Sequence, residues 1–261
     1  TTLGGDDEGP TMARPFEGPR SRLNASLTSR RAVSIGSATL DDLKLIKSTF
    51  GTTVNDAFLA ACTSSLREYL RSRGDRCDRP LVCSVPVSVH GRSEEADTVN
   101  QVSNMFVRLP VDIEDHVEQL MRVRSDTRDA KIVHGALGAD VIGDVTELTP
   151  PAIFNLASRM YSGARLAERL PPIHNLIVSN VPGPPVPLFV AGAKIVGIYP
   201  FGPLTEGSGL NITVLSNMGN MDIGVISCPD TVPGAEDITR GIESAIDALV
   251  VAAEEERRRR A

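Results

Sequence analysis

Segments of strand length rich in valine and isoleucine alternate along this chain with longer segments whose apolar residues recur at helical spacing. Val54, Phe58, Cys62, Leu66 and Leu70 recur every four residues, which predicts an amphipathic helix over residues 52–73. Apolar runs rich in β-branched residues predict strands at 32–36, 81–89, 102–109, 175–180, 194–199, 210–216 and 221–227. Further helices are predicted at 39–50, 113–131 and 238–249, and in two pieces over 136–170. The alternation predicts an α/β (α+β) fold, a mixed sheet with packed helices.

Two local features refine this prediction. Pro86 lies inside a predicted strand, and because proline removes a ladder donor, that strand is expected to be an edge strand or bulged. Residues 217–220, Asn-Met-Gly-Asn, separate the last two predicted strands and are typical of a hairpin turn.

Composition divides the chain into three parts. Residues 1–24 are rich in Gly, Asp, Pro and Arg, which predicts a linker or a flexible arm that lies on another lobe. Residues 25–253 carry the alternating apolar segments and form the globular part. Residues 254–261 hold three glutamates and then four arginines, which predicts a charged tail at a solvated helix end. Attraction of this tail to an anionic membrane surface is the alternative.

The bulk composition argues against several classes of protein. A net charge of −6, an aromatic content of 4% and the absence of Trp argue against a nucleic-acid-binding surface. No apolar stretch approaches the ~20 residues that span a bilayer. No signal peptide opens the chain, so a cytoplasmic protein is expected. The chain begins with Thr1, which suggests a processed product or a fragment.

Motifs that hold metals or cofactors are absent from the sequence. The cysteines and histidines show no metal-ligand spacing, so no metal is expected and the thiols are expected to be reduced. No GxxxxGK[ST], GxGxxG or GxSxG pattern occurs, so no bound cofactor is expected. Each histidine stands alone and is assigned to the surface or a loop. His174 follows two prolines at the start of a predicted strand, and it is the one histidine that we retain as a candidate general base.

The start of helix 52–73 carries two polar residues that need an explanation. Asn55 falls in the middle of the apolar stripe and Asp56 at its edge, where polar groups are unfavourable unless they form hydrogen bonds. One hypothesis gives both residues a role in a site. The alternative makes Thr53 and Asp56 a capping box and lets Asn55 serve a neighbouring loop.

Two further motifs lie at predicted strand ends. Residues 178–184 end a strand with Asn180 and continue as Val-Pro-Gly183-Pro, a stiff turn that either lines a channel or forms a rigid corner. In residues 206–212, two glycines precede Asn211 and allow a ligand or a second backbone to approach.

Taken together and in this order, the motifs resemble those of the bacterial wax ester synthase/diacylglycerol acyltransferase family. The Asn55–Asp56 pair is similar to the ND motif of that family. The C-terminal signature of the family is similar to residues 179–184, 188–193, 199–203 and 209–212, and residues 86–89 and 100–105 match as well. The resemblance runs from about Phe16 to Leu249. His90 and Val99 depart from it, because the family often has Arg and Gly there.

The resemblance implies the C-terminal lobe of a two-lobed fold related to chloramphenicol acetyltransferase, with the active site in a tunnel between the lobes. It also implies transfer of a long-chain acyl group from acyl-CoA, a substrate and not a cofactor, to diacylglycerol or a fatty alcohol. The catalytic histidine of the family belongs to an HHxxxDG motif in the N-terminal lobe, and no two histidines are adjacent here. The isolated chain is therefore expected to be inactive and to expose an apolar face.

The implied mechanism has a histidine base that deprotonates the acceptor hydroxyl, which then attacks the thioester. Asn amides or backbone N–H groups stabilise the oxyanion. The resemblance assigns supporting catalytic roles to Asn55 and Asp56, and substrate-binding positions to Asn180, Gly183 and Asn211. A peripheral contact with the inner membrane face or with lipid droplets is also expected. The alternatives are a non-catalytic lobe that binds lipid or a partner, and a condensation domain of peptide synthesis with the same fold.

Overall fold

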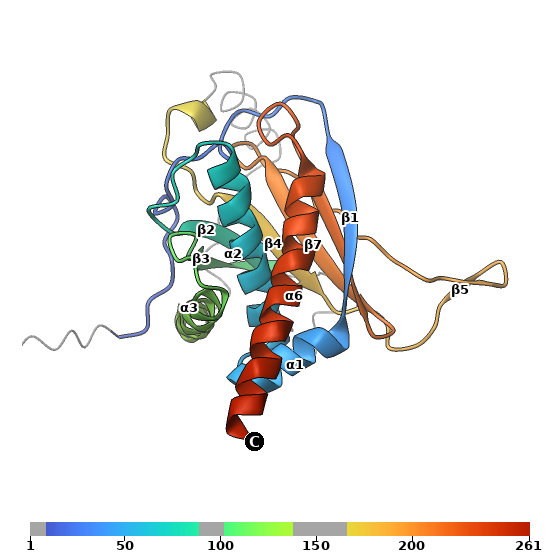
Figure 1. Ribbon diagram of the computed structural model, residues 1–261. Coiled ribbons are helices and arrows are strands. Elements are labelled where there is room, and N and C mark those ends of the chain that lie inside the picture. Colours follow the sequence, from blue (N-terminus) through green and yellow to red (C-terminus); the bar gives the residue numbers. More distant parts are fainter. Residues whose placement is uncertain (1–8, 89–101, 138–165) are drawn as a thin grey trace, which may run out of the picture.

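The computed structural model describes residues 9–88, 102–137 and 166–261. Its main sheet has six strands in the order β1-β8-β7-β4-β2-β3 (Figure 1). The strands are β1 (Ala32–Thr39), β2 (Leu81–Ser88), β3 (Val102–Leu109), β4 (Leu176–Val181), β7 (Leu210–Asn217) and β8 (Asn220–Ser227). The helices are α1 (Leu40–Phe50), α2 (Val54–Ser72), α3 (His116–Leu137) and α6 (Ala235–Arg260), with a 3₁₀ turn η1 (Leu166–Glu168). A separate ribbon consists of β5 (Phe189–Val190) and β6 (Ala193–Lys194).

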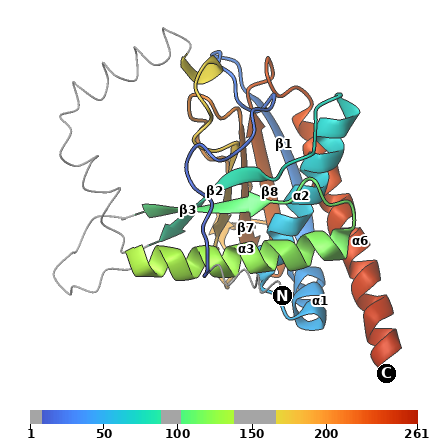
Figure 2. The same ribbon diagram turned by 90° about the vertical axis from the view of Figure 1, so that its left-hand side faces the viewer.

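The main sheet is mixed, as the alternation of elements predicted. β4 pairs in parallel with β2 and β7, whereas the β1–β8, β7–β8 and β2–β3 pairs are antiparallel. The helices cover one face of this sheet, and α2 lies between α3 and α6 (Figures 1 and 2). The predicted apolar stripe of α2 is buried there, with Phe58, Leu66 and Leu70 in the core. The four-residue period of this helix was therefore a correct guide to its packing.

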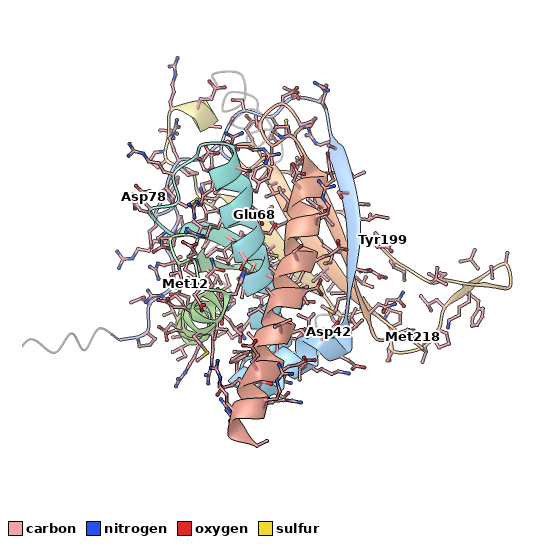
Figure 3. The ribbon with its side chains drawn as sticks, in the orientation of Figure 1. Met12, Asp42, Glu68, Asp78, Tyr199 and Met218 are labelled. Atoms are coloured by element: carbon pink, nitrogen blue, oxygen red, sulfur yellow. The ribbon has the colours of Figure 1, made fainter. Side chains whose placement is uncertain are left out.

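The predicted turn at residues 217–220 is confirmed. It joins β7 to β8, and Met218 and Gly219 adopt positive φ values of 48° and 92°. Met218 lies at the tip of the hairpin beside the start of α1, where the Leu40 N–H donates to the Gly219 carbonyl at 2.7 Å (Figure 3). Glycine adopts this left-handed conformation without a steric penalty, which explains the signal in the sequence.

The prediction that Pro86 marks an edge strand is wrong. β2 lies between β4 and β3, and Pro86 pairs in regular register with Asn104. The pairing of β2 with β4 covers only Cys83 and Ser84. Pro86 therefore falls beyond the end of this parallel pairing, so its missing N–H breaks no ladder hydrogen bond on that side.

The strand predicted at 194–199 is also wrong, because only Ala193–Lys194 forms a strand, in the small ribbon with β5. Ala191 and Gly192 make the turn of this ribbon with positive φ. The ribbon projects from the body of the molecule (Figure 1). Its apolar side chains are exposed, Phe189 by 60% and Val190 by 64%, and Val196, which follows the ribbon, is exposed by 82%. Val33 and Ile35 on β1 are also more than half exposed.

Residues 9–24 form an arm that lies against this chain's own sheet. Leu23 and Ala13 are buried. The Arg108 guanidinium on β3 donates to both carboxylate oxygens of Glu17, at 2.5 and 3.0 Å. The described part of the predicted linker or arm is thus packed, while the domain boundaries at 24 and 253 remain predictions.

The charged C-terminal segment continues α6, which extends to Arg260. Arg257 donates to the hydroxyl oxygens of Thr49 at 2.9 Å and Ser48 at 2.6 Å on α1. Four arginines in the last turn of a helix also interact favourably with its dipole. Within the described residues, no helix is both long and apolar enough to cross a membrane.

The His174 ring, near the arm, gives a testable pH dependence. It packs beside the Phe106 ring, and neither ring nitrogen has a hydrogen-bond partner within the described residues. Burial lowers the pKa of His174, because the charged imidazolium loses its hydration. At a pH above the ordinary histidine pKa of about 6.5, His174 does not change the free energy of unfolding. Below it the unfolded chain takes up a proton that the folded chain binds only at lower pH, so stability is lost.

We therefore expect His174→Phe to reduce the loss of unfolding free energy between pH 7.5 and pH 5.5. The measurement is urea denaturation of both proteins at both pH values, and the informative quantity is the difference between pH values within each protein. The contributions of carboxylates that are present in both proteins cancel in this comparison. An equal pH dependence in the two proteins would exclude His174 as a source of acid sensitivity.

Candidate functional site

The start of α2 is built around a capping box. The Asp56 N–H donates to the Thr53 hydroxyl at 3.1 Å, and the Thr53 N–H donates to the Asp56 carboxylate at 2.9 Å. The other carboxylate oxygen of Asp56 accepts from the Thr127 hydroxyl of α3 at 2.7 Å. Asp56 is only 3% exposed. Its carboxylate therefore fixes the helix start and ties α2 to α3, which matches the capping alternative for this residue.

Asn55 and Asn180 lie together although 125 residues separate them in the chain. Asn180 is near the end of β4, and its side-chain Nδ2 donates to Asn55 Oδ1 at 3.5 Å. Both residues are half-buried. This contact uses the Asn55 oxygen as acceptor, so the Asn55 amide nitrogen remains a donor without a partner among the described residues.

Gly183 follows β4 two residues after the strand ends. Its N–H donates to the Ser216 hydroxyl at 3.0 Å. A Cβ at this position would lie 1.9 Å from the Ser216 carbonyl oxygen, so only glycine fits without a backbone shift. Gly183 thus brings the turn after β4 against β7, close in sequence to Asn180.

Asn211 is placed on the other face of the sheet from Asn180. Asn211 pairs with Ile177, and Asn180 pairs with Val214, so the two asparagines point to opposite faces. The Asn211 amide donates to the Pro203 carbonyl at 3.0 Å and accepts from the Thr213 hydroxyl at 2.8 Å. At 2% exposure, Asn211 holds the segment around Gly202 and Pro203 on the sheet and does not join the Asn55–Asn180 pair.

None of the described histidines contacts this pair. His174 precedes β4 and contacts Phe106, so it lies at the opposite end of that strand from Asn180. His134 contacts the Ser103 hydroxyl at 2.9 Å, and His116 contacts the Ser64 hydroxyl at 2.8 Å. His90 lies outside the described residues. The pair is therefore an arrangement of amide groups without a described base.

The buried cysteines on α2 and β2 do not supply a nucleophile. Burial raises the pKa of the Cys62 thiol well above its usual value and that of Cys83 to about 12, so both thiols stay protonated. The described residues contain no group of three or more His, Cys, Asp or Glu arranged to hold a metal ion. Sequence reasoning missed Thr127 and Ser216, which fix Asp56 and Gly183, because their partners are distant in the chain.

Amide donors at a helix start can stabilise developing negative charge. The first-turn N–H groups of α2 carry the positive end of its dipole. Asn180 orients Asn55 beside them, which leaves the Asn55 Nδ2 as a further donor. Such preorganised donors suit the oxyanion of an acyl-transfer reaction, provided that a base and a nucleophile are supplied.

Two family models match the chain. The WS/DGAT C-terminal domain matches residues 99–250, and the wax ester synthase/diacylglycerol acyltransferase catalytic domain matches residues 3–58. Rv1760 of Mycobacterium tuberculosis, whose name assigns diacylglycerol O-acyltransferase activity provisionally, is 35% identical over 93% of this chain and 48% of its own length. O-acyltransferase WSD of Acinetobacter baylyi is 29% identical over 95% of this chain and 53% of its own.

A solved structure confirms the fold class. The wax ester synthase/diacylglycerol acyltransferase from Marinobacter aquaeolei VT8 superposes with a TM-score of 0.70 and 26% identity, covering 91% of this chain and 52% of that one. The chain thus spans about half the length of the relatives it matches. The C-terminal domain model alone covers more than half of its residues. On this evidence the chain belongs to the wax ester synthase/diacylglycerol acyltransferase family.

Proposed function

We propose that this chain is the C-terminal lobe of an O-acyltransferase that moves a long-chain acyl group from acyl-CoA to diacylglycerol or a fatty alcohol. The catalytic histidine would come from an N-terminal lobe that carries HHxxxDG. Family membership supports the reaction class. The observation that carries the role of this lobe is the Asn55–Asn180 pair at the start of α2.

In the proposed reaction, the histidine of the other lobe removes the proton of the acceptor hydroxyl. The alkoxide oxygen attacks the thioester carbonyl, and the C–O bond forms as the carbonyl oxygen becomes an oxyanion. Asn55 Nδ2 and the backbone N–H groups of Val54 and Asn55 donate to this oxyanion, since the Asp56 N–H is used in the capping box. The C–S bond then breaks, and the histidine returns the proton to the thiolate, which releases CoA and the ester. Asp56 acts indirectly, by fixing the helix start that presents these donors.

A second candidate function is a lobe that binds lipid or a partner and catalyses nothing. The exposed apolar side chains in and just after the β5–β6 ribbon favour it, because Phe189, Val190 and Val196 present apolar surface to solvent. Such surface suits a lipid as well as another lobe, so exposure alone does not separate the two functions.

The test measures CoA release from a long-chain acyl-CoA with diacylglycerol, and separately with a fatty alcohol. It uses this chain alone, and this chain co-expressed with an N-terminal lobe that carries HHxxxDG. The proposal expects release only from the combination. Robust release by the chain alone would contradict the proposal that its base lies elsewhere. No release from a combination shown to be folded and associated would favour the binding lobe.

A further inference from the structure

β1 is the outermost strand at one edge of the main sheet, and no other described strand pairs with its outer side (Figure 1). Its residues pair with β8 in regular register along the whole strand, so β1 contains no bulge. It also contains neither a charged residue nor a proline in its sequence, AVSIGSAT. Charges, prolines and bulges are the usual features that keep an edge strand from pairing with another chain. β1 therefore lacks the local protection expected of an edge strand that faces water.

The opposite side of the sheet provides a contrast. β3 carries a charged residue, Arg108, whose guanidinium donates to the Glu17 carboxylate of the N-terminal arm. Ala13 of the same arm is buried with Val82 of β2 and Phe106 of β3. The chain thus packs its own arm on the β3 side of the sheet, whereas β1 has neither a charge nor such a segment.

One hydrogen bond shows which backbone groups of β1 are free. The Ser37 N–H donates to the Glu243 carboxylate of α6 at 2.9 Å, so it points away from β8. Because backbone groups alternate in direction along a strand, the N–H and C=O groups of Val33 and Ile35 also point outward. None of these groups on Val33 and Ile35 has a partner within the described residues.

The side chains of Val33 and Ile35 place apolar surface next to these free groups. A Cβ on Gly36 would meet side chains of α6, so the residues that alternate with it, Val33 and Ile35, face away from the helices. Ile35 pairs with Gly224, and Phe201 lies against Gly224 on that face. Val33, Ile35 and Phe201 are all exposed, so they form an apolar strip along the edge of the sheet.

We propose that the outer edge of β1 binds β1 of a second copy of this chain as an antiparallel pair, which joins the two sheets into one. A two-fold symmetric contact requires a surface complementary to itself, and the edge of an antiparallel strand meets this requirement. One register pairs all the free groups of Val33 and Ile35 within β1 and leaves the Ser37 N–H with Glu243. It places Val33 of each copy opposite Ile35 of the other, which also brings their apolar side chains together.

Charge complementarity supports the same register. It places Arg31, which precedes β1, opposite Ser37 of the second copy, with about 5.5 Å between the two Cα atoms. The Glu243 carboxylate that holds this Ser37 is then within reach of the arginine side chain. Arg31 donates to the backbone carbonyls of Thr28 and Arg30, and neither Arg31 nor Glu243 forms an ion pair within the described residues. Two-fold symmetry produces the Arg31–Glu243 pair twice.

The β5–β6 ribbon adds apolar area on the side that the second copy would occupy. A single strand edge is a small contact, whereas stable interfaces bury about 1,200–2,000 Å² in total. The ribbon projects past β1 on this side of the molecule (Figure 1), and its Phe189 and Val190 side chains are exposed. A second copy paired along β1 therefore has further apolar surface to cover.

The first test is sedimentation velocity of the whole chain over a range of concentrations. A dimer is expected, and Ile35→Lys is expected to raise its Kd by about 10-fold or more, because a lysine blocks pairing at a strand edge. Ile132→Lys is the matched control, since Ile132 is exposed on α3, and its expected effect is less than about 2-fold. Equal effects of the two variants would overturn the proposal. A chain that is monomeric at every concentration would also overturn it, and would leave β1 to another partner such as a second lobe.

Disulfide formation tests the register. Ser34 lies on the proposed symmetry axis, opposite Ser34 of the second copy, with about 4.5 Å between the Cα atoms. Ser34→Cys is therefore expected to form a disulfide-linked dimer under mild oxidation. Ser37→Cys is the matched control, because its two copies lie about 20 Å apart in this register. The parent chain measures the background from its own cysteines. Linkage through Ser37→Cys but not through Ser34→Cys would contradict the proposal.

A charge exchange tests the contact between copies. Arg31→Glu and Glu243→Lys are each expected to weaken the dimer by about 5-fold, and the double variant is expected to restore it. Within one chain Arg31 lies about 20 Å from Ser37 along the strand, so restoration requires a contact between copies.

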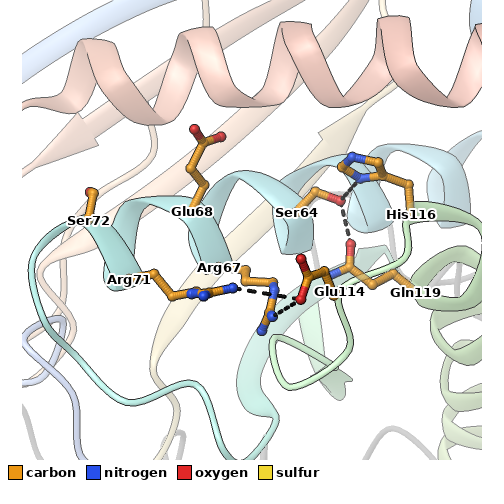
Figure 4. A pocket seen from close by; sticks show the side chains of 8 residues that line it. All are labelled: Ser64, Arg67, Glu68, Arg71, Ser72, Glu114, His116 and Gln119. Carbon is orange, nitrogen blue, oxygen red and sulfur yellow. Dashed lines mark hydrogen bonds and ion pairs between the residues drawn. The ribbon is translucent and has the colours of Figure 1, made fainter.

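Arg71→Glu is the control for the change in net charge. Arg71 lines a pocket of about 430 Å³ between α2 and α3 and pairs there with Glu114 at 3.8 Å (Figure 4). This pocket lies on the α3 side of α2, whereas β1 packs against α6, so Arg71→Glu is expected to change the Kd by less than about 2-fold. A double variant that stays as weak as the single variants would contradict the proposal. None of these measurements uses acyl transfer, so their outcome is separate from that of the proposed function.

Discussion

Asn175→Ala is expected to lower the free energy of unfolding by about 3–5 kcal/mol, because it leaves several buried polar groups without partners. Asn175 has no exposed surface. Its Oδ1 accepts from the Val82 N–H at 2.8 Å, and its Nδ2 donates to the Pro19 carbonyl and to Asn24 Oδ1, each at 2.7 Å. One side chain therefore joins β2, the N-terminal arm and the segment before β4.

Urea denaturation of the variant and the parent chain measures this loss. Asn220→Ala is the matched control, since Asn220 is exposed at the start of β8 and is expected to change stability by less than about 0.5 kcal/mol. Limited proteolysis adds a local readout, because a released arm is cleaved earlier than the sheet. A loss below about 1 kcal/mol, with an arm that stays protected, would show that water replaces the Asn175 contacts.

Local periodicity was enough to predict most of the described elements. The four-residue stripe of α2 identifies its buried face, and the Gly219 turn identifies the β7–β8 hairpin. Both signals arise within a few residues, where the backbone conformation itself selects the residue types. The order of the strands does not follow from such signals, because β1 pairs with β8 and β4 with β7 across long stretches of chain.

The wrong predictions also have local causes. Residues 194–199 contain the β-branched Ile195, Val196 and Ile198, yet Val196 is 82% exposed because nothing in the described chain packs on it. Pro86 indicated an edge strand because sequence does not show where the pairing of β2 with β4 ends. Residues 9–24 lack large apolar runs, but the buried Asn175 amide and the Arg108–Glu17 ion pair hold the arm. Such single polar contacts have no periodic signature.

The candidate site was predictable only in part, for the same reason. The ND pair marked the correct helix start, but its two members have different environments, since Asp56 caps α2 while Asn55 contacts Asn180. The pleat separates Asn180 from Asn211, and the relative register of β4 and β7 is needed to see it. Mutations at these four positions are therefore expected to differ in whether they change activity, stability or both.

Asn55→Ala is expected to reduce kcat for CoA release by about 10²–10³-fold in the combination with an HHxxxDG lobe, as loss of an oxyanion donor does elsewhere. Stability should change little, because the half-buried Asn55 makes one long side-chain contact, at 3.5 Å. Asn180→Ala is expected to have a smaller effect on kcat, since it removes only the group that orients Asn55. The measurement is the rate at saturating acyl-CoA, with the melting temperature of each variant.

Asp56→Ala and Asn211→Ala serve as contrasts. Asp56→Ala removes the capping box and the Thr127 contact, so it should lower unfolding free energy by about 1–3 kcal/mol and reduce activity through the displaced helix start. Asn211→Ala should destabilise the fold, because the buried Asn211 amide binds Pro203 and Thr213 on the far face of the sheet. It should leave kcat of the folded fraction unchanged. A kcat that falls for Asn211→Ala but not for Asn55→Ala would place the oxyanion donors on the other face of the sheet. The acyl-transfer role proposed for the start of α2 would then be wrong.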